Sequence, residues 1–157
     1  MNVFQKIIET LDKEKVDYEI KEHPPTPTSE DSAKHRKEPL SIGAKALILK
    51  SNDVYIMCVV PGNKKLDSRK VKDILKIKKL KFATTEEVKL VSHCVPGSIP
   101  PFGNLFGIKV LMDKSFQDNE NIAFNAGLLT KSIKMKEIDY RRIVNPIVDD
   151  ISRIDLL

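Results

Sequence analysis

Few side chains in this sequence could act as metal ligands or as nucleophiles. The soft ligands lack CxxC and HxxxH spacing, and they are His23, His35, His93, Cys58 and Cys94. Zinc sites use closely spaced ligands, so we expect no metal, and the absence of GxGxxG and GxxxxGK argues against a nucleotide cofactor. His93 and Cys94 are adjacent, but neighbouring residues of an extended chain point to opposite sides, which disfavours a Cys–His nucleophile.

The basic residues are concentrated in one segment. Between Lys64 and Lys81 there are nine Lys and Arg against two Asp, which is +7 in 18 residues, whereas the whole chain carries +5. Such a patch favours a polyanion, because each neutralised phosphate releases condensed counterions. A solvated helix face is the alternative. Only Phe82 stands beside the patch, so contact with a phosphate backbone is expected rather than base stacking.

Length and composition fit one globular domain. The chain has 157 residues, 41% of them hydrophobic, and its longest uncharged apolar run, Val54–Val60, is far shorter than the roughly 20 residues of a membrane span. The N-terminus has no signal-peptide core, and two cysteines do not make a disulfide framework. We therefore expect a soluble cytoplasmic protein without a membrane partner, with Cys58 buried as a small apolar side chain.

Hydrophobic periodicity and turn residues predict the elements that position these residues. The predicted helices cover 2–14, a segment from Thr28 or Ser29 to about Arg36, 68–76 after an Asp67 cap, 85–91, 136–144 and 146–154. The predicted strands cover 16–21, 44–50, 53–60, 80–83, 106–112, 121–125 and 131–135. Prolines and glycines make 95–103 a constrained loop. This order predicts a mixed α/β (α+β) domain with a largely antiparallel central sheet or barrel and helices packed around it.

Four segments together resemble the YbaK / prolyl-tRNA synthetase-associated domain family. They are HPPTPTSEDSA (23–33), IGAKALILK (42–50), VPGNKKLDSRKVKDIL with LKFATTEEV (60–75 and 80–88), and VPGSIPPFG followed by IAFNAG (95–103 and 122–127). The resemblance implies a YbaK-like domain over 1–145, with 146–157 as a C-terminal helix or the start of a linker. Members of the family hydrolyse amino acids wrongly esterified to tRNA, either as free-standing proteins or as parts of prolyl-tRNA synthetase.

The resemblance also implies roles for individual residues. Lys45 matches the family's strand lysine, which places it at the 3′-terminal adenosine or its phosphate; Lys50, at the strand end, is the alternative lysine and is expected to face water. An aminoacyl ester is already activated, so a positioned water and backbone N–H groups near glycine can suffice for hydrolysis. The implied catalytic residues are Lys45, Gly97 and Gly103. The implied amino-acid pocket contains His23, Thr28, Ser29, Pro101, Phe102, Asn125, Ala126 and Gly127. The alternatives are a surface position for His23, a helix N-cap at Ser29 and a core position for Phe102. The candidates for tRNA phosphate contact are Lys64, Lys65, Arg69 and Lys70.

The resemblance favours alanine attached to tRNA for proline as the substrate. A pocket sized for proline excludes a smaller side chain by only about 1–3 kcal/mol, so a second, hydrolytic site is useful. The branch that removes cysteine has a Ser-Gly-Gly turn and a nearby acid, whereas this chain has Asn125-Ala126-Gly127 and Ser132. We expect Asn125 and the methyl of Ala126 to narrow the pocket for alanine, with cysteine as the alternative.

Two other classes of function remain open at this point. The chain could be a non-catalytic tRNA-binding module, such as an appended domain of prolyl-tRNA synthetase, or a general RNA-binding domain. The expected partners are the aminoacyl-tRNA 3′ end and, as a second partner, prolyl-tRNA synthetase. Lys45, Gly97 and Gly103 favour the enzyme over either binding module.

Overall fold

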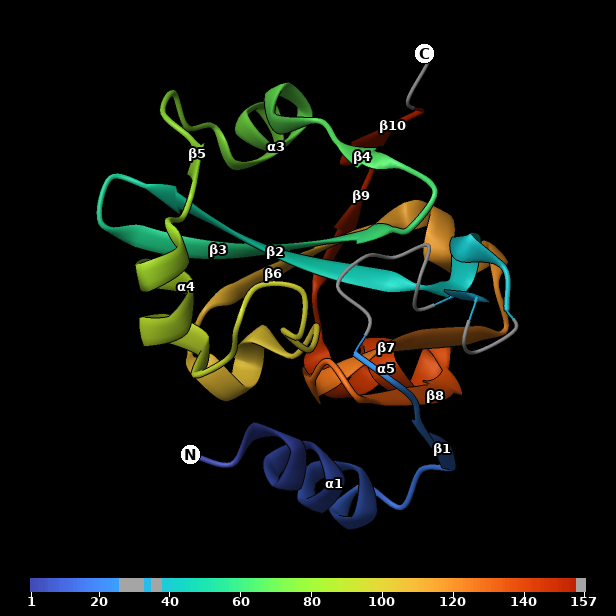
Figure 1. Cartoon of the computed structure of the whole chain (residues 1–157). Coiled ribbons are helices and arrows are strands. Elements are labelled where there is room, and N and C mark those ends of the chain that lie inside the picture. Colours follow the sequence, from blue (N-terminus) through green and yellow to red (C-terminus); the bar gives the residue numbers. More distant parts are fainter. Residues whose placement is uncertain (26–32, 35–37, 155–157) are drawn as a thin grey trace.

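A five-stranded mixed sheet forms the centre of the computed structural model, which describes residues 1–25, 33–34 and 38–154 (Figure 1). Its strand order is β5 (Lys81–Phe82), β2 (Ala44–Ser51), β3 (Val54–Pro61), β6 (Lys109–Asp113) and β9 (Ile147–Asp149). The hairpin β2–β3 is antiparallel, whereas β6 runs parallel to both β3 and β9. Strand β3, at the centre of the sheet, is buried along most of its length, as its continuous apolar sequence predicts.

Two smaller sheets complete the strand pairing among the described residues. Strands β1 (Tyr18–Glu22), β8 (Lys131–Lys136) and β7 (Asn121–Leu128) form an antiparallel sheet in that order, and β4 (Lys65–Leu66) pairs with β10 (Ser152–Arg153). The helices are α1 (Val3–Lys13), α3 (Ser68–Leu75), α4 (Thr85–Ser92) and α5 (Glu137–Val144), with 3₁₀ turns η1 (Leu40–Ile42), η2 (Gly103–Phe106) and η3 (Lys114–Asp118). The predicted mixed α/β class is confirmed.

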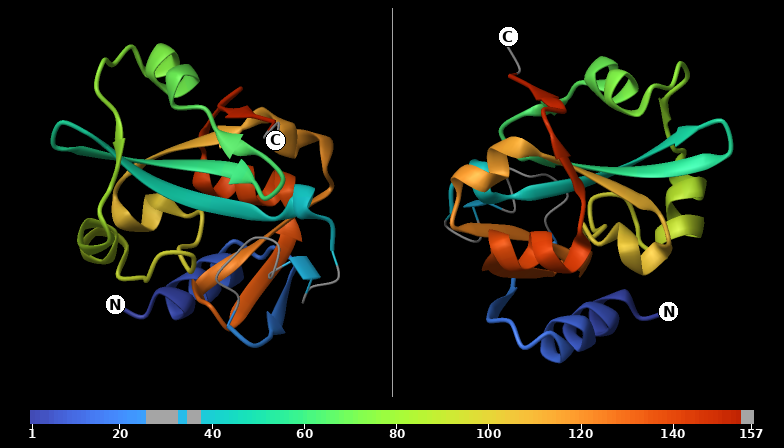
Figure 2. Two further views of the ribbon diagram at one scale, coloured as in Figure 1. Left: turned by 45° about the horizontal axis from the view of Figure 1, so that its top comes forward. Right: turned by 180° about the vertical axis from the view of Figure 1, so that it is seen from behind.

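The central sheet separates two hydrophobic clusters. One face, which includes Ile48, Met57 and Met112, packs toward the β7–β8 sheet and α5. The other face, which includes Leu49 and Cys58, packs against α3. Figure 2 shows α3 on one side of the sheet and α5 with the second sheet on the other. Cys58 is buried as predicted, and desolvation raises the pKa of its thiol to about 12.

Most of the predicted helices are confirmed, and so is the predicted Asp67 cap at the start of α3. The Asp67 carboxylate accepts hydrogen bonds from the N–H groups of Arg69 and Lys70, and Thr84 with Glu87 forms a capping box. The helix predicted from Thr28 or Ser29 to Arg36 falls almost entirely outside the described residues. No helix in the described part of the chain is long and apolar enough to span a membrane.

The predicted helix over 146–154 is wrong, because this segment forms β9 and β10. Ile147 pairs with Leu111 at the edge of the central sheet, and the N–H of Ile151 donates a hydrogen bond to Asp113. Two other boundaries also shift. The strand predicted from 106 begins at Lys109, after η2 ends at Gly107 in a left-handed conformation. Strand β7 continues past Asn125 through a bulge to Leu128.

The expectation that Lys50 faces water is wrong as well. Its ammonium donates a hydrogen bond to Glu87 at 2.7 Å, and the Tyr55 hydroxyl donates to the same carboxylate oxygen at 3.0 Å. Both charged side chains are only about one-fifth exposed. Lys50, together with the backbone N–H of Thr84 and the Tyr55 hydroxyl, lowers the pKa of Glu87 to about 2. This contact fixes α4 against the β2–β3 hairpin.

Substituting Glu87→Gln is expected to destabilise the fold at neutral pH and to have little effect in acid. A carboxyl whose pKa is lowered by folding stabilises the native state above its unfolded pKa, here 4.5, and this contribution is lost as pH falls toward 2. The difference between the urea midpoints of the variant and the wild type should therefore shrink between pH 5 and pH 2. Glu86→Gln, an exposed neighbour in the same helical turn, is the matched control. A pH-independent difference for Glu87→Gln would contradict the ion-pair explanation.

Candidate active site

The loop 95–103 is held in place by strand β7. The Asn125 side-chain amide donates a hydrogen bond to the carbonyl oxygen of Gly97 at 2.8 Å. Two residues farther along, the N–H of Gly127 donates to the carbonyl oxygen of Ser98 at 2.9 Å. Gly97 is exposed and has φ +89°, a conformation that glycine adopts without strain. The structure thus brings Gly97, Asn125 and Gly127 together, as the motif requires.

A chain of hydrogen bonds extends from this loop to His23. The Ser132 hydroxyl donates to Asn125 Oδ1 at 3.1 Å, and Ser132 Oγ lies 2.7 Å from His23 Nε2. His23 Nδ1 lies 2.9 Å from the carbonyl oxygen of Pro24. Ser132 joins Asn125 to His23, although in the sequence it stood out only as a departure from the family's acidic residue.

Two of the predicted glycines are explained by packing. A Cβ on Gly103 would lie 2.5 Å from Val110 Cγ2, and one on Gly127 would lie 2.9 Å from Val3 Cγ1. Gly103 is buried, and its carbonyl oxygen accepts the N–H of Ile108. A side chain at residue 103 would clash with β6, which explains why this position is a glycine. Gly97 is the glycine of this loop that faces the surface.

Pro101 and Phe102 anchor the loop to the core. The Phe102 ring is fully buried, with its centroid 5.3 Å from that of Phe124 and 5.4 Å from that of Tyr140. The Tyr140 hydroxyl donates a hydrogen bond to the carbonyl oxygen of Pro101. Ala126 is also fully buried in the same cluster, so its methyl packs in the core and does not narrow a surface pocket. Asn125, through its side chain, and Gly127, through its N–H, are the residues of this stretch that contact the loop.

A cavity of about 180 Å³ lies between the loop and the edge of β2. Ala46, Ile48, Val88, Pro96 and Gly97 contribute to its wall, and it is called the edge cavity below. Strand β5 pairs with β2 only at Leu49 and Lys50, near the C-terminal end of β2. The carbonyl oxygen of Ile48 accepts the N–H of Ala83, so the Ile48 peptide groups face away from β3. Backbone N–H and C=O groups point to alternate sides of a strand from one residue to the next, so those of Ala46, two residues before Ile48, also point away from β3. On that side of β2 lies the cavity.

Lys45 lies next to this cavity at the start of β2. It pairs with Val60 and is half-buried. Side chains alternate along the strand, so Lys45 shares a face with Leu49, opposite to the face on which Phe102 packs. The loop contacts β2 through the cavity wall at Ala46, and Lys45 is the neighbouring residue of the same strand. The four-carbon stem of lysine suits such a position, because it allows the ammonium to extend past the edge.

The other predicted site residues are placed unevenly. His23 is half-buried at the end of β1, whereas Thr28 and Ser29 lie outside the described residues. Lys65 and Arg69 are exposed and Lys64 is half-buried. Lys70 has a structural contact: its ammonium donates to both Asp150 carboxylate oxygens at 3.0 Å and to the Ser152 carbonyl oxygen at 2.7 Å. No group of three or more His, Cys, Asp or Glu that could hold a metal ion occurs among the described residues.

Comparison with known proteins identifies the family. The model of the aminoacyl-tRNA editing domain family matches residues 23–143. The Multifunctional Ser/Thr-tRNA deacylase ProXp-y of Escherichia coli (strain K12) is 31% identical over 147 residues, which cover 90% of this chain and 88% of that protein. The Prolyl-tRNA editing protein ProX of Acetoanaerobium sticklandii is 25% identical over 150 residues, with 92% of each chain covered.

Solved structures share the fold. The crystal structure of hypothetical protein APE2540 superposes with a TM-score of 0.87 at 20% identity and covers 94% of this chain and 99% of that one. That of a proposed trans-editing enzyme for prolyl tRNA synthetase gives a TM-score of 0.85 at 17% identity, with 98% of both chains covered. At these identities the structures support the fold, and the sequence matches support the family.

Proposed function

Because this chain belongs to the aminoacyl-tRNA editing domain family, a family of aminoacyl-tRNA deacylases, we propose that it hydrolyses the ester between a tRNA and a wrongly attached small amino acid. The observation that supports this most directly is the exposed Gly97 of the loop, held by Asn125 beside the unpaired edge of β2. This arrangement presents fixed backbone groups from two segments to one small cavity. A substrate can be oriented there without a side-chain nucleophile.

In the proposed reaction, water attacks the carbonyl carbon of the ester. The bond from that carbon to the ribose oxygen breaks, the ribose oxygen takes a proton, and the products are the free amino acid and tRNA. The negative charge that develops on the carbonyl oxygen is stabilised by backbone N–H groups, which cost no reorganisation because the loop is already fixed. Lys45 holds the 3′ end of the tRNA at the edge of β2, and Asn125 keeps the loop in its working position.

Alanine attached to tRNA for proline is the first proposed substrate. The edge cavity is small, and Asn125 stands beside the loop that borders it, which favours a short side chain. Burial of the Ala126 methyl removes one argument for alanine over cysteine, so the preference now rests on Asn125 and on the departure of Asn125–Gly127 and Ser132 from the cysteine-removing branch. Association with prolyl-tRNA synthetase stays a prediction.

Serine or threonine is the second proposed substrate. The Escherichia coli relative named as a Ser/Thr-tRNA deacylase is 31% identical to this chain. The hydrogen-bonded chain from Asn125 through Ser132 to His23 also offers polar partners to a hydroxyl group. A site with such partners distinguishes hydroxyl-bearing side chains from apolar ones far better than an apolar pocket distinguishes a single methylene.

Single-turnover hydrolysis of five aminoacyl-tRNAs tests both proposals. We expect rapid loss of the alanyl ester on tRNA for proline, slower loss of the cysteinyl ester, and no loss of the correct prolyl ester. Seryl- and threonyl-tRNA are measured in parallel, and faster loss of these would select the second proposal. If the protein binds all of these tRNAs but hydrolyses none, the deacylase proposal fails and a binding module remains.

A further inference from the structure

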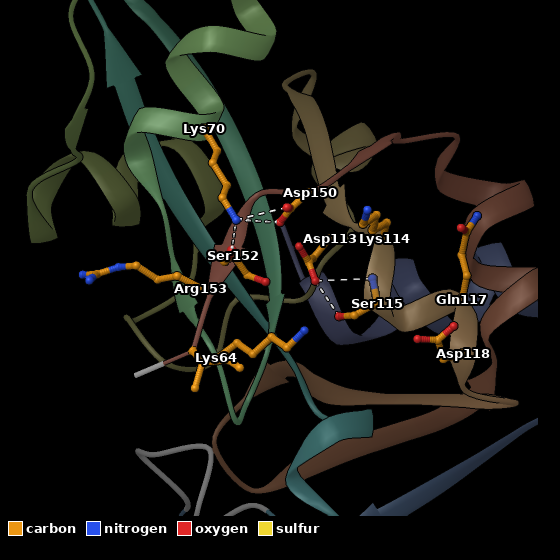
Figure 3. A pocket seen from close by; sticks show the side chains of 11 residues that line it. Lys64, Lys70, Asp113, Lys114, Ser115, Gln117, Asp118, Asp150, Ser152 and Arg153 are labelled. Carbon is orange, nitrogen blue, oxygen red and sulfur yellow. Dashed lines mark hydrogen bonds and ion pairs between the residues drawn. The ribbon is translucent and has the colours of Figure 1, made fainter. Parts of the chain in front are cut away.

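A large polar pocket on the α3 side of the central sheet is not part of the candidate active site. It has a volume of about 690 Å³ and is called the basic pocket below (Figure 3). Its cations come from four separate segments: Lys64 follows β3, Lys70 is on α3, Lys114 begins η3 and Arg153 is on β10. The wrongly predicted C-terminal segment thus supplies one side of this pocket.

The acidic residues of the pocket are largely occupied by contacts within the protein. Asp150 binds the ammonium of Lys70, and Figure 3 shows Lys70 reaching from α3 to Asp150 and Ser152. Asp113 accepts hydrogen bonds from Ser115 and from the N–H of Ile151.

What remains of the pocket's charge is a net positive excess. In the described part of the chain, the cations of Lys64, Lys114 and Arg153 make no ion pair, and the carboxylates that line the pocket besides Asp150 are Asp113 and Asp118. With the Lys70–Asp150 pair set aside, three cations therefore oppose two anions, a net charge of +1. Figure 3 shows Lys64 extending toward Ser115, and Arg153 extending away from the other labelled side chains, at the outer rim.

Strand pairing places the basic pocket on the same face of the sheet as Lys45. Lys45 pairs with Val60, and the parallel pairing of β3 with β6 puts Asp113 beside Val60. Directly neighbouring positions on adjacent strands point to the same face, so Lys45 and Asp113 share a face two strands apart, about 10 Å. Lys45 and the basic pocket therefore lie on the same side of the sheet, and a nucleic-acid strand that contacts both has to pass outside the buried Val60 and Asp113.

We propose that the basic pocket binds backbone phosphates of the tRNA acceptor strand through Lys64, Lys114 and Arg153. Lys70, which the sequence grouped with the phosphate ligands, instead ties α3 to the C-terminal strands. This inference rests on the proposed function, because it takes the substrate to be aminoacyl-tRNA. It adds two phosphate ligands, Lys114 and Arg153, that lie outside the basic segment of the sequence.

The test compares two triple variants with the same loss of charge. The pocket variant carries Lys64→Ala, Lys114→Ala and Arg153→Ala. The control variant carries Lys78→Ala, Lys79→Ala and Lys81→Ala, three exposed lysines of the basic segment that do not line the pocket. Binding of uncharged tRNA for proline is measured by fluorescence anisotropy at several salt concentrations, and circular dichroism verifies that both variants are folded.

We expect the pocket variant to bind uncharged tRNA on the order of 100-fold more weakly at 0.1 M salt. The slope of the logarithm of the association constant against the logarithm of the salt concentration should become shallower by about 2–3. Each lost phosphate contact contributes about 0.7–0.9 to this slope. The control variant should lose only a few-fold in affinity. Equal losses in the two variants would mean a diffuse electrostatic attraction, and an unchanged pocket variant would mean that tRNA does not enter the pocket; either result overturns the proposal.

Uncharged tRNA keeps this test independent of hydrolysis, so the pocket inference can hold even if the deacylase proposal fails. Where the wild type does hydrolyse the ester, a second measurement separates the pocket from the catalytic residues. The pocket variant should raise KM for aminoacyl-tRNA and leave kcat unchanged. With the amino acid attached to a CCA trinucleotide, which lacks the acceptor stem, the pocket variant and the wild type should be equal. A kcat defect on the trinucleotide would contradict a role limited to the acceptor strand.

Discussion

Lys45→Ala is expected to lower the single-turnover rate of ester hydrolysis by about 10²–10³-fold, the usual effect of removing one fixed polar group from a hydrolytic site. Lys45 is half-buried at the unpaired edge of β2, beside the cavity that Gly97 borders. A positive charge at a partly water-excluded position interacts more strongly with a bound phosphate or ribose oxygen than it would in bulk water. Alanine removes the charge without altering the backbone pairing to Val60.

Lys50→Ala is the matched control for this prediction. It lies on the same strand, but its ammonium is bound to Glu87 and it does not line the edge cavity. We expect it to reduce stability and to leave the hydrolysis rate within a few-fold of the wild type, when both are assayed well below their unfolding temperatures. Lys45→Arg should recover only part of the rate, because the planar guanidinium differs in shape and hydration from an ammonium. Equal rates for wild type and Lys45→Ala would exclude Lys45 from the chemistry.

The sequence predicted those elements whose signals are local. The apolar run 54–60 with a preceding alternating strand predicts the β2–β3 hairpin, and Asp67 predicts the start of α3. Residues 146–154 were ambiguous, because Ile147, Val148, Ile151 and Ile154 fit a helical period as well as two short strands. The choice depends on the open edge of β6, a neighbour that is distant in sequence.

In the candidate site, too, the sequence predicted what local motifs show and missed contacts between distant segments. The glycine and asparagine motifs predicted that Gly97 and Asn125 belong together, and the structure places them in contact. The link from His23 to Ser132 spans 109 residues, so no local pattern could reveal it. Burial was equally hidden, since a motif does not show whether Phe102 faces a substrate or the core. The Phe102 ring faces the core because it packs against Phe124 and Tyr140, which are distant in the sequence and meet it only in the folded chain.

Phe102→Ala is expected to reduce the free energy of unfolding by about 3–5 kcal/mol, the typical cost of truncating a fully buried phenylalanine. The ring is completely buried and makes edge-to-face contacts with Phe124 and Tyr140, which contribute beyond the buried area. The loss is a large part of the 5–15 kcal/mol that stabilises a typical domain. Urea unfolding followed by circular dichroism at neutral pH measures it. Phe82→Ala, at a phenylalanine that is 60% exposed, is the control and should change stability by less than about 0.5 kcal/mol.

Phe102→Leu separates a packing role from a role in substrate binding. Leucine keeps most of the buried volume, so it should cost less stability than alanine and retain the loop that Tyr140 anchors through Pro101. If Phe102 acts only by supporting the loop, the leucine variant should hydrolyse alanyl and seryl esters in the same ratio as the wild type. A changed ratio would show that the ring contacts the amino acid, as the sequence motif implied. An unchanged ratio together with a lowered stability assigns substrate discrimination to groups nearer the surface, of which Asn125 is the foremost.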